Sequence, residues 1–91
     1  MNLDLDGERI RSTADFHRAV RNASGISFYG ENLSALWDLL TGLAEPPIKI
    51  SWRNAKQSEE AMGDDFWKII QVINRAVLSN GRGGFSFELQ R

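Results

Sequence analysis

The sequence contains no cysteine, and this absence excludes a disulfide scaffold, a cysteine-ligated zinc site and a thiol nucleophile. It contains one histidine, His17, and no strand-turn-serine motif, so a Ser-His-Asp arrangement has no support. Its longest apolar runs are a few residues, too short to cross a membrane, and the N-terminal residues lack the apolar core of a signal peptide. We therefore expect a cytoplasmic protein without metal or cofactor.

Neither sign of charge dominates. Twelve acidic and eleven basic side chains give a net charge of −1, which argues against binding to nucleic acid or membranes through bulk charge. The length of 91 residues and the 42% hydrophobic content are typical of one globular domain. We expect a single domain over residues 1–91.

One segment resembles a nucleic-acid motif. Residues 82–87, Arg-Gly-Gly-Phe-Ser-Phe, are loosely similar to the aromatic strand of an RNA-binding domain. The alternation around Phe85 and Phe87 predicts that both rings face the helices, and RNA-binding domains of that kind use an antiparallel sheet. We therefore expect no direct contact with nucleic acid.

Periodicity predicts three strands and three helices. Apolar and polar residues alternate over 2–6, 48–52 and 85–89, whereas apolar residues recur at helical spacing over 12–23, 33–41 and 65–79. Residues 53–63 are polar and irregular, and we expect a loop there. The order of elements favours an α/β fold with a parallel sheet. Because one side of every strand is polar, we expect two layers, with all helices packed on one face, and Trp52 in the core.

The middle of the chain is acidic. No Lys, Arg or His occurs between Arg21 and Lys49, whereas Glu31, Asp38 and Glu45 give this stretch a charge of −3. Two interpretations remain open at this point: a solvated helix face, or an acidic surface that meets a basic partner.

The same region carries a family resemblance. Residues 28–42, Phe-Tyr-Gly-Glu-Asn-Leu-Ser-Ala-Leu-Trp-Asp-Leu-Leu-Thr-Gly, resemble the signature loop and helix of the barstar family, intracellular inhibitors of the secreted ribonuclease barnase. The similarity extends to residues 7–12, to Asp15 and His17, to Glu45-Pro46 and Trp52-Arg53, and to Gln71-Val72. It implies a small three-stranded parallel sheet with helices, in agreement with the periodicity.

The resemblance also implies a mechanism. In that family the loop and second helix plug the nuclease active site, and a carboxylate occupies the place of the RNA phosphate. Asp38 matches that carboxylate, and Tyr29, Gly30, Asn32 and Leu33 match the loop and helix start that touch the nuclease. The complete set of predicted partner-binding residues is Tyr29, Gly30, Asn32, Leu33, Ser34, Trp37, Asp38, Thr41, Gly42, Leu43, Glu45 and Arg75.

The sequence departs from the family pattern at four positions. Family members can carry an acid where this chain has Ser34, an aromatic residue where it has Leu43, and an acid on the later helix where it has Arg75. Phe28 stands in place of a tyrosine. These departures predict poor inhibition of barnase itself.

The sequence thus predicts a stoichiometric inhibitor of a basic ribonuclease, monomeric when unbound, that performs no catalysis. Two alternatives remain: a non-inhibitory interaction module with a partner that is not a nuclease, and an enzyme. A nuclease assay separates the three.

Overall fold

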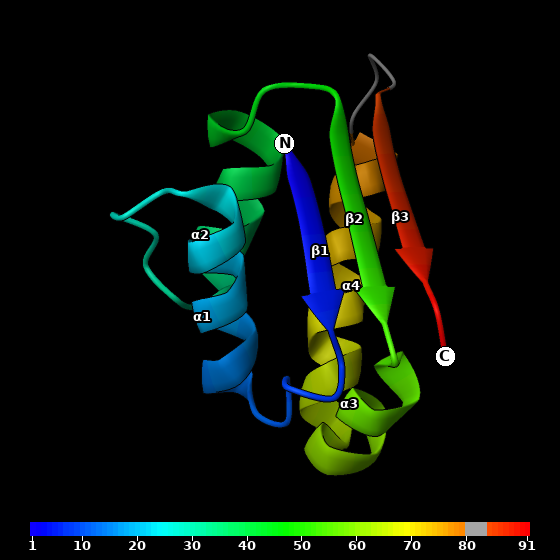
Figure 1. Cartoon of the computed structure of the whole chain (residues 1–91). Coiled ribbons are helices and arrows are strands. Elements are labelled where there is room, and N and C mark those ends of the chain that lie inside the picture. The colour runs from blue at the N-terminus through cyan, green and yellow to red at the C-terminus, as the bar shows by residue number, and fades with distance from the viewer. Residues whose placement is uncertain (80–83) are drawn as a thin grey trace.

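A computed structural model describes residues 1–79 and 84–91 of the chain (Figure 1). In chain order, the elements are β1 (Asn2–Asp6), α1 (Thr13–Ser24), α2 (Leu33–Asp38), η1 (Leu39–Leu43), β2 (Ile48–Arg53), α3 (Ala55–Met62), α4 (Asp64–Ser79) and β3 (Phe85–Leu89). The three predicted strands are therefore confirmed to within a residue at their ends. The three predicted helices are confirmed to within two residues, although the one predicted over 33–41 is α2 followed by η1.

The three strands form one parallel sheet in the order β1-β2-β3. Leu3 lies opposite Ile50 of the central strand, which in turn lies opposite Phe87. Along β2, buried residues alternate with exposed or half-exposed ones, as expected when one face is covered and the other meets solvent. Figure 1 views the sheet from its open side, with α4 passing behind it. The prediction of two layers is confirmed.

Trp52 joins the helices to the sheet. Its fully buried ring stacks on Phe16 of α1 at a centroid distance of 5.1 Å and lies tilted against Phe66 of α4 at 5.1 Å. Because a single side of β2 contacts both helices, α1 and α4 must cover the same face of the sheet. Such aromatic pairs each contribute about 0.5–1.5 kcal/mol beyond the burial of their surface.

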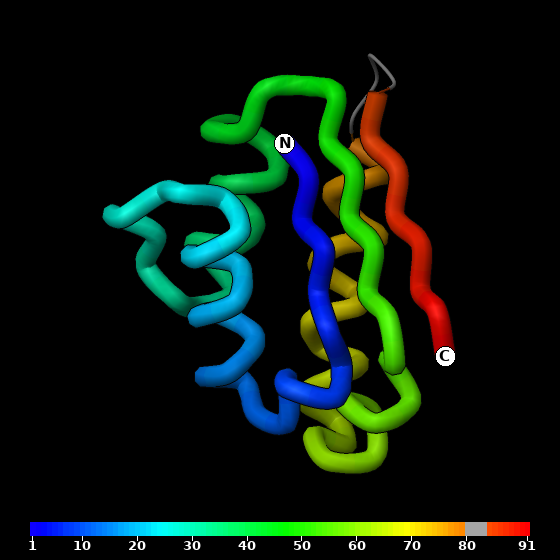
Figure 2. The backbone as a smooth tube through the Cα atoms, viewed as in Figure 1, coloured from blue at the N-terminus to red at the C-terminus, as the bar shows by residue number. Residues whose placement is uncertain are grey.

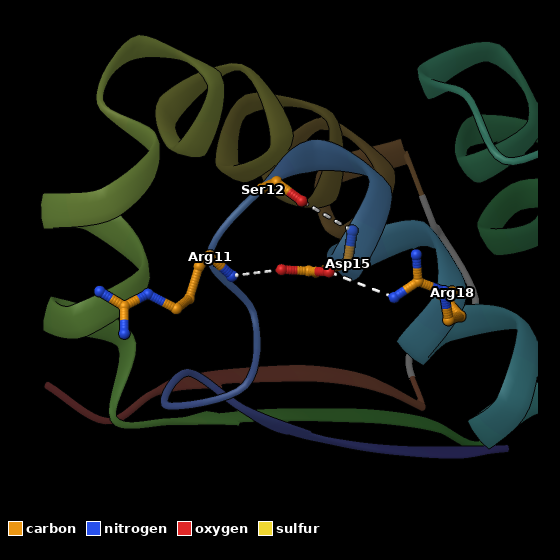
Figure 3. Close-up of polar contacts among 4 residues, drawn as sticks. All are labelled: Arg11, Ser12, Asp15 and Arg18. Atoms are coloured by element: carbon orange, nitrogen blue, oxygen red, sulfur yellow. Dashed lines mark hydrogen bonds and ion pairs between the residues drawn. The ribbon is translucent and has the colours of Figure 1, made fainter.

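The start of α1 is fixed by a capping network (Figure 3). The Ser12 hydroxyl accepts a hydrogen bond from the Asp15 amide at 3.1 Å, and the Asp15 carboxylate accepts one from the Arg11 amide at 3.1 Å and one from the Arg18 guanidinium at 3.2 Å. The bond from the Arg11 amide is the largest cause of the lowered pKa of Asp15. Gly25, with φ of 71°, ends the helix in the left-handed conformation that glycine favours.

The prediction of a loop over residues 53–63 was wrong, because α3 occupies most of it. The inward face of this helix carries Ala55 and Ser58 in place of large apolar residues, so it has no hydrophobic stripe. Instead, the buried Ser58 hydroxyl accepts from the indole of Trp52 at 3.2 Å and donates to the carbonyl of Gly7 at 3.2 Å. The helix is therefore held by a small polar residue, and its sequence lacks the apolar periodicity from which a helix is predicted.

The segment that resembles an RNA-binding strand lies partly outside the described residues, since Arg82 and Gly83 are not among them. Phe85 and Phe87 are half-buried and pack against the core, on the covered face as predicted. Over residues 1–79 and 84–91, no helix is both long and apolar enough to cross a membrane. The same residues contain no cluster of three or more acidic or histidine side chains suited to a metal ion.

Candidate partner-binding surface

The helix α2 is short, and both its N-cap and its buried side hold it firmly in the fold. Asn32 caps it: its side-chain oxygen accepts a hydrogen bond from the Ala35 amide at 2.7 Å. Leu36 is completely buried, and it holds one side of the helix in the core. The opposite side consequently presents Ser34, Trp37 and Asp38 to solvent; 38% of the Trp37 surface is exposed.

A π-helical turn, η1, continues α2 to Leu43, two residues beyond the predicted end of the helix at residue 41. Its wide turn is closed by a hydrogen bond of 2.8 Å from the Ala44 amide to the Leu39 carbonyl. Leu39 and Leu40 are buried, and the three residues that follow them, Thr41, Gly42 and Leu43, are all exposed. The Thr41 hydroxyl donates to the carbonyl of Trp37 at 2.7 Å and ties the turn back to α2. Three of the predicted site residues are thus displayed next to one another.

An open groove lies between α2 and α4 and brings together five of the twelve predicted residues. It has a volume of about 510 Å³ and is lined by Leu33, Ser34, Trp37, Asp38, Val72 and Arg75. The sequence placed Asp38 and Arg75 on separate elements 37 positions apart, and the structure brings them to one surface. Val72 was not among the predicted residues, although its place three positions before Arg75 puts it beside that residue on a helix.

The acidic charges of this region are not equivalent. Glu31 lies 3.8 Å from the guanidinium of Arg21, which partly offsets its charge. Within the described part of the chain, Asp38 and Glu45 take part in no ion pair, and both are exposed. The carboxylate of Asp38 is therefore available to an incoming cation.

Tyr29 differs from the other predicted residues because only 7% of its surface is exposed. Its hydroxyl lies 2.6 Å from Nδ1 of His17, which is itself 1% exposed. Burial raises the pKa of the Tyr29 hydroxyl and lowers the pKa of the His17 imidazole, so both groups are neutral near pH 7. In the free protein this pair fastens the loop before α2 to α1, and a partner would meet little of the tyrosine.

The loop between α1 and α2 carries Phe28, which departs from the family pattern and was not included among the predicted partner-binding residues. Phe28 exposes 73% of its surface, on a segment that projects from the side of the molecule (Figure 2). Such exposure is unusual for phenylalanine. The available signal was the place of Phe28 in the family motif, where family members carry a tyrosine. Gly30, in the same loop, does not adopt a positive φ, which is found instead at Glu31 with φ of 54°.

Comparison with known proteins places these features in a family. The family model described as "Barstar (barnase inhibitor)" matches residues 1–90. A protein of Bacillus subtilis (strain 168), named "Putative ribonuclease inhibitor YrdF", is 37% identical over 73 residues, which cover 79% of this chain and 80% of that protein.

Proposed function

Because this chain belongs to the barstar family, we propose that it inhibits a ribonuclease by occupying the enzyme's active site with α2, η1 and the loop before them. The family match and the name of the Bacillus subtilis relative support a role as a ribonuclease inhibitor in general. The proposal adds the mode of action, a one-to-one complex of two proteins. In this proposal the chain is a cytoplasmic monomer before it binds, and it catalyses no reaction.

The chemistry of the target supports this mode. A site that cleaves RNA gathers Arg, Lys and His side chains around a phosphodiester, and a carboxylate can accept the same charge-assisted hydrogen bonds. Charge of opposite sign on the two proteins also accelerates their encounter. A carboxylate fixed on a folded inhibitor can therefore stand where the phosphate would lie and exclude the substrate.

The exposed carboxylate of Asp38 is the observation that carries the proposal. It stands on a capped helix whose other side is buried, it pairs with no cation among the described residues, and it borders a groove. The fixed helix lowers the conformational entropy that binding must remove. The one histidine supports an inhibitor over an enzyme, because its imidazole is buried against Tyr29 and cannot reach a substrate.

The proposal can be tested by depletion of ribonuclease activity. Wild-type protein and the variant Asp38→Ala are immobilised on separate columns, and culture fluid and lysate of the source organism are passed over both. We expect the wild-type column to remove ribonuclease activity that the variant column leaves in the flow-through. If the wild-type column retains a protein but removes no nuclease activity, the chain is instead a non-inhibitory interaction module.

A further inference from the structure

The groove between α2 and α4 carries two opposite charges, Asp38 and Arg75. Asp38 of α2 and Arg75 of α4 both line it, together with the apolar side chains of Leu33, Trp37 and Val72. Over residues 1–79 and 84–91, neither charged side chain belongs to an ion pair. On α4 the acidic residues, Asp64 and Asp65, lie in the first turn, about ten positions before Arg75. No carboxylate at helical spacing can therefore satisfy this guanidinium.

Both walls are held in place by the core. Leu36 anchors α2, while Ile73 and Ala76, on either side of Arg75 in the sequence, are buried and anchor α4. Because buried residues anchor both helices, the backbone positions that carry Asp38 and Arg75 are held relative to each other. A complementary surface must offer a cation to Asp38 and an anion to Arg75, with apolar atoms between them.

Building on the proposed ribonuclease target, we infer that Arg75 determines which ribonuclease this protein binds. Its target presents a carboxylate opposite Arg75, beside the basic site that receives Asp38. A nuclease with basic groups at both places meets like charge at Arg75, which disfavours its binding. The family resemblance implies an acid at this position in inhibitors of barnase. Barnase can therefore serve as a nuclease that this protein should bind poorly because of Arg75.

The test measures inhibition of barnase by four folded proteins: wild type, Arg75→Gln, Arg75→Glu, and the double variant Ser34→Asp with Arg75→Glu. We expect wild type to inhibit weakly and inhibition to strengthen in that order. The double variant should gain at least tenfold in inhibition constant, about 1.4 kcal/mol. The gain should shrink with added salt, because charges across a partly exposed interface are screened. Circular dichroism confirms that each variant is folded.

Lys49→Glu provides the matched control, because it makes the same change of charge at an exposed position on β2, on the open face of the sheet. It should leave barnase inhibition within twofold of wild type. The inference is overturned if wild type already inhibits barnase tightly, if folded Arg75→Glu gains nothing over wild type, or if Lys49→Glu gains as much. Any of these results would leave the proposed function intact if the wild-type column still depletes the native ribonuclease activity. Failure of the inference on Arg75 can therefore be distinguished from failure of the proposed function.

Discussion

At the scale of single residues, the account rests on Asp38. We expect Asp38→Ala to weaken binding to the ribonuclease retained by the wild-type column by about 2 kcal/mol or more, in the range of an interface hot spot. The free energy of unfolding should change by less than about 0.5 kcal/mol, because the side chain is exposed and makes no ion pair within the described residues. Calorimetric titration and urea unfolding measure the two quantities. Equal losses in both would identify a structural residue and contradict the assignment.

His17 predicts a pH dependence of stability. Burial lowers its pKa in the folded state below the unfolded value of about 6.5. The folded state therefore disfavours the proton, so the stabilisation is complete above about pH 6.5 and is lost as the pH falls through the lower folded pKa. The protonated imidazole would carry an N–H on both ring nitrogens, and its buried Nε2 has no partner among the described residues.

Urea unfolding of wild type and His17→Gln between pH 4.5 and 8 tests this prediction. Asp6 and Asp15, whose carboxyl pKa values are also lowered, are present in both proteins, so the difference between the curves isolates the histidine. Wild type should lose more stability than the variant as the pH falls below about 6.5. Parallel curves would show that His17 titrates normally and would contradict its burial as a neutral group.

At the scale of elements, Gly7 and Gly42 differ in the space around them: Gly7 lies against another backbone segment, whereas Gly42 has open space beside it. A Cβ atom on Gly7 would lie 2.0 Å from the carbonyl oxygen of Asn54, where the chain leaves β2 for α3. A Cβ on Gly42, in η1, would meet no atom within 4 Å. Gly7→Ala must therefore displace backbone, whereas Gly42→Ala need not.

We expect Gly7→Ala to lower the free energy of unfolding by about 1–3 kcal/mol or more, the usual cost of overpacking. Gly42→Ala should leave it unchanged or raise it by up to about 1 kcal/mol, because alanine restricts the unfolded chain. Thermal or urea unfolding of both variants measures the contrast. If Gly7→Ala were as stable as wild type, the contact between the β1–α1 turn and the end of β2 would be wrong.

The elements also show which parts of the fold the sequence could predict. Strands and helices with a regular apolar pattern, such as β2 and α4, were predicted to within a residue or so of their ends. The helix α3 was missed because its buried residues are small, and because Ser58 is satisfied by Trp52 and Gly7, which are distant in sequence. The π-helical turn was missed because a hydrogen bond from residue i to i−5 leaves no distinctive residue pattern.

At the scale of the whole molecule, the candidate surface is an assembly of segments that the sequence could only partly predict. Its acidic stretch and its family motif are local in sequence, and they identified α2 directly. The groove required the packing of α2 against α4, which no local pattern specifies, so Val72 was missed. Tyr29 was included because of its place in the motif, although its hydroxyl faces His17 inside the protein.

We expect one inhibitor molecule to close one ribonuclease active site, and a titration of ribonuclease activity measures this stoichiometry. The ribonuclease retained by the wild-type column is held at a concentration well above the dissociation constant, and inhibitor is added in small steps. RNA cleavage should fall linearly to zero at an equimolar ratio of inhibitor to ribonuclease. Light scattering should then find a complex of one molecule of each protein. Substantial cleavage by the saturated complex would contradict the account, since it would show that the bound protein leaves the active site open.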